Sequence, residues 1–130
     1  MDSPYEQLGG EAQVVALAQA FYDAMEAHEP GLTAAHRCVS PGRVDPIVRE
    51  RFSLFLVGWL GGPQTYIEQH GHPRLRMRHA RVAITQELRD AWLRSMTRAM
   101  DQRDVKGDAR RFLDSRFAEV ADFLRNTAEP

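Results

Sequence analysis

The sequence predicts an all-α protein. Apolar residues recur at helical spacing in several long stretches, and residues that start or stop helices flank most of them. No stretch alternates between apolar and polar residues with the period of two that is typical of a half-buried strand. A chain of 130 residues is long enough to bury one core, so we expect a single domain over residues 1–130.

The first long helix is predicted to begin at Glu11. Residues up to Gly10 read as a lead-in that closes with Gly9-Gly10, a pair that breaks helices and permits a sharp turn. The helix should end before Pro30-Gly31, and residues 32–44 are predicted to be irregular. Its inward stripe consists of Val14, Ala18, Phe21, Tyr22 and Met25.

The second long helix has the clearest boundaries in the chain. Asp45 can cap it, Pro46 suits its first position, and Gly61-Gly62-Pro63 should stop it. The apolar positions at spacings of three and four are Val48, Phe52, Phe55, Leu56 and Trp59.

Four further helical segments are predicted after Pro63. A short turn over 65–69 carries Tyr66, and another ends near His79. Thr85 can cap a long helix, and a last helix follows a polar connector over 101–108 and frays at 126–130. The inward residues of these two helices are Leu88, Trp92, Met96 and Ala99 or Met100, and then Leu113, Phe117, Val120 and Leu124.

Composition argues against several classes of protein. The chain holds 17 Lys and Arg against 18 Asp and Glu, and this balance does not favour nucleic acid as a partner. The single cysteine, Cys38, cannot form an internal disulfide, so an oxidising compartment is not required. The longest apolar run (54–60) is too short to span a membrane, and no signal segment is recognisable. We therefore expect a cytoplasmic monomer or homodimer without a nucleic-acid or membrane partner.

His79 is the first candidate for chemistry. It follows Arg74, Arg76 and Arg78 and lies beside apolar Met77. An imidazole among guanidiniums and apolar side chains suits a flat, apolar, iron-bearing ring with carboxylate arms, because imidazole can ligate the iron and guanidinium can bind the carboxylates. The same pattern also suits a surface or helix-capping histidine.

A zinc site is a second interpretation of the histidines. His70, His72 and His79 could supply three ligands. The Gly-flanked His72-Pro73 pair reads more simply as a turn, and the stretch offers no acidic residue to act as a base.

Several motifs together resemble the truncated haemoglobins of group II. They are Leu8-Gly9-Gly10, Phe21-Tyr22, Gly61-Gly62-Pro63, the run from His70 to His79, and Asp90-Ala91-Trp92-Leu93. The resemblance covers nearly the whole chain. It implies a truncated globin fold, in which two helices lie over two others around a haem b.

The resemblance also implies which residues hold the haem. His79 matches the proximal iron ligand, and Arg78 matches an arginine at a haem propionate, with Arg76 and Tyr66 as assistants. The family often has Ala-Pro-Phe after the ligand, whereas this chain has Ala80-Arg81-Val82-Ala83. The missing phenyl ring alters the expected packing on the proximal side of the haem. The expected apolar walls are Phe52, Phe55, Met77, Ile84 and Met96, although such stripes would also serve as plain core in any helical protein.

On the distal side, Tyr22 and Trp92 match residues that hydrogen-bond the diatomic ligand. A third distal position falls at Ala35 by direct counting, or at His36 if the preceding loop holds one extra residue, and we favour His36. Ordinary globins place a distal histidine at a position that falls near Val48 here, with Phe52 one turn later; neither can donate a hydrogen bond.

The implied function is binding of oxygen, carbon monoxide and nitric oxide at a five-coordinate iron. A polar cage that retains oxygen favours nitric oxide dioxygenase or peroxidase-like activity, which needs a separate reductase. A non-catalytic oxygen-binding, storage or sensing protein is the alternative. A helical interaction domain without haem is a third hypothesis, and it predicts a colourless protein.

Overall fold

The computed structural model describes residues 2–72 and 83–124. A short helix, α1 (Pro4–Leu8), precedes the long helix α2 (Glu11–His28) and the short α3 (Pro30–Ala34). A hairpin of β1 (Cys38–Ser40) and β2 (Arg43–Val44) leads to α4 (Pro46–Trp59) and α5 (Thr65–His70). The long helices α7 (Gln86–Gln102) and α8 (Gly107–Leu124) follow.

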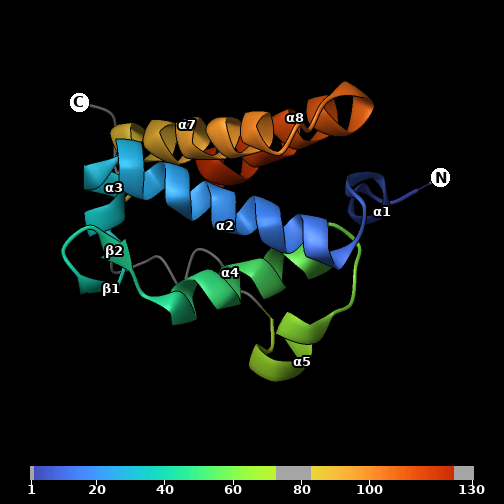
Figure 1. The fold of residues 1–130 in the computed structure, drawn as a ribbon, viewed down its shortest axis with the longest axis horizontal. Helices are drawn as coiled ribbons and strands as arrows, with labels where there is room; N and C mark the ends of the chain where they lie inside the picture. The colour runs from blue at the N-terminus through green and yellow to red at the C-terminus, as the bar shows by residue number, and fades with distance from the viewer. Residues whose placement is uncertain (1, 73–82, 125–130) are drawn as a thin grey trace.

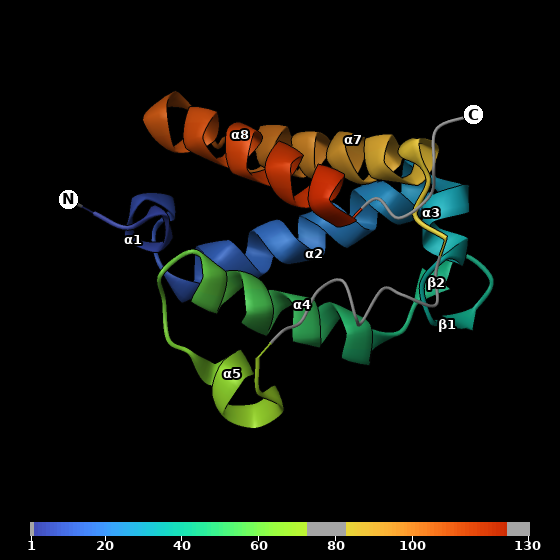
Figure 2. The ribbon, with the colours of Figure 1, turned by 180° about the vertical axis from the view of Figure 1, so that it is seen from behind.

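Four helices form the two-over-two arrangement that was expected. Helix α2 packs most extensively against α7 and next against α4, and α7 packs against α8. Figure 1 shows the pair α7 and α8 on one side of α2 and α4 on the other, with α5 beyond α4. Figure 2 shows from behind that α8 runs beside α7. No helix in the described ranges is long and apolar enough to cross a membrane.

The predicted helix starts are confirmed by their caps. The Asp45 carboxylate accepts a hydrogen bond from the Ile47 N–H at 2.9 Å, directly before Pro46. The Thr85 hydroxyl accepts one from the Leu88 N–H at 3.1 Å. These bonds satisfy N–H groups that have no partner within the helix, which explains why the two helices begin there. At Gly9 the backbone φ is 106°, a conformation that glycine adopts without strain.

Three parts of the chain differ from the prediction. The lead-in contains α1, which Ser3 caps through the Glu6 N–H. Residues 32–44 are not simply irregular, because they hold the end of α3 and the β-hairpin, which turns at Gly42. The connector between the last helices covers only residues 103–106. Each missed element is too short to show a periodic pattern.

The core lies where α2 crosses its neighbours. The predicted inward stripe of α2 is buried throughout, and Met96, Met100, Leu113 and Phe117 are buried opposite it. Helix α4 is different, because its side chains Leu56 and Val57 are buried whereas Phe52, Phe55 and Trp59 are only half-buried. The aromatic face of α4 is therefore not covered by the helical core.

Candidate functional site

A cavity of about 260 Å³ adjoins the half-buried face of α4. We call it the main cavity. Its size is near the lower end of small-molecule pockets, roughly 300–1,000 Å³. Its lining residues come from α2, α4, α5, α7, α8 and the loop after α3: Tyr22, His36, Val48, Arg51, Phe52, Phe55, Leu56, Trp59, Tyr66, Trp92, Phe117, Val120 and Leu124.

Helix α4 gives the main cavity an aromatic floor. The rings of Phe52 and Phe55 stack with centroids 6.4 Å apart, and those of Phe55 and Trp59 stack at the same separation. Their spacing of three and four residues puts all three rings on one face of the helix. A row of half-buried aromatic faces leaves apolar surface to be covered, so the cavity chemistry fits a flat apolar group such as a porphyrin.

Tyr22 reaches the main cavity from α2. The residue is 3% exposed, and its ring makes T-shaped contacts with Phe21 and Phe52 at 5.1 and 5.7 Å between centroids. Burial raises the pKa of the Tyr22 phenol far above its usual range, although the positive charge of Arg49 acts in the opposite direction. The hydroxyl therefore keeps its proton at physiological pH and can donate a hydrogen bond.

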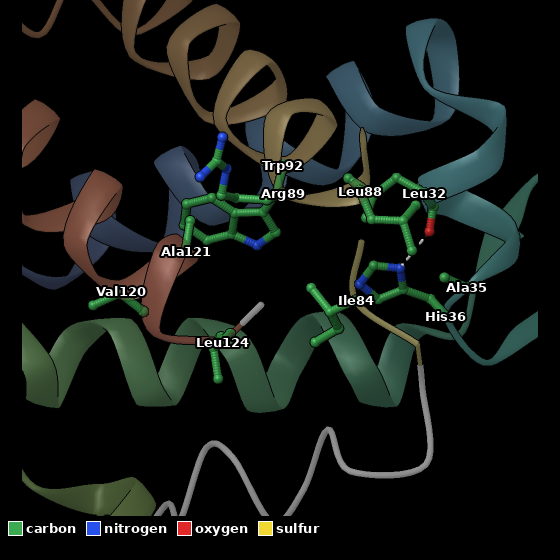
Figure 3. Close-up of a pocket in the computed structure, with 10 residues that line it drawn as sticks. All are labelled: Leu32, Ala35, His36, Ile84, Leu88, Arg89, Trp92, Val120, Ala121 and Leu124. Atoms are coloured by element: carbon green, nitrogen blue, oxygen red, sulfur yellow. Dashed lines mark hydrogen bonds between the residues drawn. The ribbon is translucent and has the colours of Figure 1, made fainter. Parts of the chain in front are cut away.

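His36 reaches the same cavity from the loop after α3. Its Nδ1 lies 2.8 Å from the Leu32 carbonyl oxygen, drawn as a dashed line in Figure 3. A carbonyl oxygen only accepts, so Nδ1 carries a hydrogen. In the neutral ring Nε2 is then an acceptor and not a donor.

Trp92 lies on α7 between two aromatic rings. Its centroid is 5.1 Å from that of Phe21 and 5.6 Å from that of Phe117. It also borders a second space of about 130 Å³, the side cavity, whose residues Figure 3 draws. His36 and Trp92 line both cavities, whereas Ala35 lines only the side cavity. Of the two candidates for the third distal position, His36 is the one that borders the main cavity.

The remaining described candidates separate into two groups. Tyr66 lines the main cavity and makes ring contacts with Phe55 at 5.8 Å and His70 at 5.1 Å between centroids. Phe52 and Phe55 also line it. Ile84 lines the side cavity instead, and Met96 is fully buried in the core and lines neither. Met96 packs on the inward face of α7, where the helical core already covers it.

His79, Arg78, Arg76 and Met77 lie outside the described residues, so their expected roles stay predictions. The same holds for the zinc interpretation, which needs His79. Across residues 2–72 and 83–124, no three His, Cys, Asp or Glu side chains gather in a way that could hold a metal ion.

Sequence reasoning missed part of the lining. Trp59, Leu56, Phe117, Val120 and Leu124 were assigned to the core, yet they border the main cavity. Arg51 had no assignment and also borders it. The helical spacing that identified these positions is the same for a core stripe and for a stripe that faces a ligand. The spacing alone therefore could not separate the two.

A helical sandwich with an apolar, aromatic-lined cavity suits a haem protein. Comparisons with known proteins show which family this chain belongs to. Residues 3–126 match the bacterial-like globin family. The group 2 truncated hemoglobin YjbI of Bacillus subtilis is 38% identical over 128 residues, which cover 98% of this chain and 92% of the relative.

Solved structures agree with that match. The cold-adapted truncated hemoglobin of the Antarctic bacterium Pseudoalteromonas haloplanktis superposes with a TM-score of 0.88 at 37% identity, covering 98% of this chain and 100% of that one. The truncated oxygen-avid haemoglobin of Bacillus subtilis gives 0.83 at 37% identity, covering 96% and 100%. This chain belongs to the bacterial-like globin family, as a truncated haemoglobin of group II. Truncated globins bind haem and oxygen.

Proposed function

We propose that this chain holds haem b in the main cavity, binds oxygen, carbon monoxide and nitric oxide there, and carries out redox chemistry on them in the cytoplasm. The observation that carries the proposal is the meeting of Tyr22, His36 and Trp92 at one aromatic-walled cavity. When bound, haem would supply an iron that takes up a diatomic molecule and exchanges electrons with it.

Each residue has a distinct part in this proposal. His79 would hold the iron from the proximal side, and Arg78, Arg76 and Tyr66 would bind the propionates. Phe52 and Phe55 would exclude water from one part of the cavity, where Val48 and Phe52 offer no hydrogen bond. Donors to the diatomic ligand must then come from Tyr22 and Trp92, with His36 beside them.

Two donors of this kind would retain oxygen strongly. A hydrogen bond to a group that carries charge contributes roughly 1.5–3 kcal/mol in a buried site. Two such bonds would slow the release of oxygen by about 10²–10⁴-fold, at 1.4 kcal/mol per decade. Slow release suits a chemical reaction better than oxygen delivery. One such reaction combines oxygen with nitric oxide and one electron to give nitrate. The other reduces peroxide with two electrons and two protons to give water. A separate reductase would supply the electrons.

The deciding experiment combines an absorption spectrum with a turnover assay. The purified protein should show a haem spectrum that changes on reduction and again on addition of carbon monoxide. Nitrate formed per haem from nitric oxide and oxygen, under a supplied reductant, should exceed one. Fast oxygen release with no more than one nitrate per haem would favour the non-catalytic alternative, an oxygen-binding, storage or sensing protein. A colourless protein that does not bind added haemin would reject both the catalytic proposal and the non-catalytic alternative.

A further inference from the structure

Arg49 is a largely buried arginine that lies against Tyr22. It is in the first turns of α4, and only 15% of its side chain is exposed. Its guanidinium carbon lies over the Tyr22 ring, 5.3 Å from the ring centroid. A guanidinium over an aromatic face is an attractive arrangement, and it gains strength where water is excluded.

Side chains of α2 hold the guanidinium in this position. Its Nη1 donates to the Gln19 side-chain oxygen at 2.9 Å and to Asp23 Oδ1 at 3.0 Å. Its Nη2 lies 2.9 Å from Glu26 Oε2. These three partners are four and three residues apart, so they lie along one side of α2, next to Tyr22. The planar head of arginine meets these partners from two separate nitrogens in a fixed plane, whereas a lysine ammonium would have to direct all three of its donors from one atom.

Glu26 links this cluster to the hairpin. Its side chain is 10% exposed, and Oε2 also accepts a hydrogen bond from the Val44 N–H at 2.8 Å. Burial alone would raise the pKa of Glu26, but the hydrogen bonds from Arg49 and Val44 outweigh it and hold the pKa below its usual range. The carboxylate is therefore charged at neutral pH and available to bind Arg49.

We propose that Arg49 is a positioning residue for Tyr22: its guanidinium, held by Gln19, Asp23 and Glu26, fixes the ring so that the hydroxyl points into the main cavity. Phe21, Phe52 and His36 pack against the ring at steep angles between the ring planes, and Arg49 is the cation that lies over the face of the ring among the described residues. The positive charge also makes the buried hydroxyl a stronger donor than burial alone would leave it. The effect on ligand release rests on the proposed function, because it requires that Tyr22 contacts the ligand. The positioning of the ring does not.

Three variants of the haem-loaded protein test the proposal. Each is made in two backgrounds, one that keeps Tyr22 and one that carries Tyr22→Phe. Arg49→Met removes the guanidinium but keeps an unbranched side chain. Arg49→Lys keeps the charge but loses the planar fork of two nitrogens that meets Gln19, Asp23 and Glu26. Arg43→Met is the matched control, because Arg43 also pairs with Glu26 but its side chain is 73% exposed.

The first measurement is oxygen dissociation by stopped flow. Arg49→Met should accelerate release about two- to tenfold when Tyr22 is present. Arg43→Met should leave the rate unchanged, and Arg49→Met should add nothing in the Tyr22→Phe protein. Equal acceleration with and without Tyr22 would overturn the proposal, since Arg49 would then act through the general stability of the fold.

The second measurement does not depend on ligand release. In protein labelled with ¹³C-tyrosine and loaded with carbon monoxide, the Tyr22 ring signal is assigned by its loss in Tyr22→Phe. Arg49→Met should shift this signal and speed ring flipping, whereas Arg43→Met should not; an unchanged signal overturns the proposal. If Arg49→Met does not fold, the Tyr22 ring signal is measured in Arg49→Lys instead, and an unchanged signal there overturns the proposal.

The two proposals can fail separately. If Tyr22→Phe leaves oxygen release unchanged, Tyr22 is not a ligand donor and that part of the proposed function is wrong. A shifted Tyr22 ring signal in Arg49→Met would still support the positioning role.

Discussion

The rings of Tyr22 and His36 lie edge to face, with centroids 5.9 Å apart and planes at 87°. They reach the main cavity from α2 and from the loop after α3. Because the Leu32 carbonyl holds the hydrogen on Nδ1 of His36, a neutral His36 presents an acceptor at Nε2. Tyr22 and Trp92 are therefore the expected donors to a ligand, and His36 is expected to act beside them.

Replacing both Tyr22 with Phe and Trp92 with Leu should accelerate oxygen release by about 10²-fold or more, because two hydrogen-bond donors are lost. Stopped-flow displacement of oxygen by carbon monoxide measures this rate. Tyr5→Phe is the control, since Tyr5 packs beside Gly62 and away from the cavity lining. An unchanged rate in the double variant would exclude the two residues as donors.

His36→Phe should accelerate oxygen release less than Tyr22→Phe does at pH 7–8. The substitution keeps a ring of similar size but removes the hydrogen bond to the Leu32 carbonyl. It also removes Nε2, which in the neutral imidazole is an acceptor and not a donor. Both variants are compared in the same displacement assay. An effect as large as that of Tyr22→Phe would mean that His36 donates to the ligand after all.

His79→Ala should lose haem or retain it only weakly, because the proximal imidazole is the bond that anchors the iron. The ratio of haem to protein absorbance after gel filtration measures retention. His72→Ala, seven residues away in the chain, is the control and should keep its haem. Full retention by His79→Ala with an unaltered five-coordinate ferrous spectrum would contradict the assignment.

Glu29→Gln should remove a pH-dependent part of the stability. Arg94 donates two hydrogen bonds of 2.9 Å to Glu29, and Arg98 adds one of 3.3 Å. The hydrogen bonds from Arg94 are the largest influence on the pKa of Glu29, which lies below its ordinary value of 4.5. A carboxylate with a lowered pKa stabilises the fold above its unfolded pKa and loses this effect as the pH falls through its folded pKa.

The wild type should therefore exceed Glu29→Gln by about 1 kcal/mol at pH 7, a modest value because the arginines are half exposed. Urea unfolding from pH 7 to pH 3 measures the difference. It should stay constant down to about pH 5 and then shrink. A difference that grows on acidification would disprove the assignment.

Gly62→Ala should destabilise the fold by about 1–3 kcal/mol through overpacking. A Cβ atom at Gly62 would lie 2.6 Å from the Tyr5 ring, closer than atoms can approach. Gly31→Ala is the control, because a Cβ there meets nothing within 4 Å and Gly31 lies inside α3. Thermal unfolding of both variants checks the prediction, and Gly62→Ala should cost less stability in a Tyr5→Ala background, where the clashing ring is absent.

The sequence predicted the long helices and the side-chain caps of α4 and α7, because these depend on local chemistry. Asp45-Pro46 and Thr85 act within their own first turn, so neighbouring residues reveal them. Motif resemblance added the family, which the comparisons confirm.

What the sequence did not show depends on contacts between distant residues. Arg49 meets Gln19, which is thirty residues earlier in the chain. Phe117 belongs to the lining only because α8 returns beside α7 and carries its ring to 5.4 Å from Trp59. Met96 and Phe52 share the same helical spacing, yet one is covered by the core and the other borders the cavity. Such differences arise from how the helices cross, which a one-dimensional pattern does not record.

Helix α2 carries Phe21 and Tyr22 next to each other, and Phe21 contacts Trp92 of α7 as well as Phe52 of α4. A stiff helix cannot shift one of these neighbours alone. Any small roll of α2 that redirects the phenol must also slide the phenyl ring across the indole on one side and the α4 ring on the other. If Tyr22 donates to the ligand as proposed, substitutions on the outer surface of α2 should therefore change the rate at which oxygen is released.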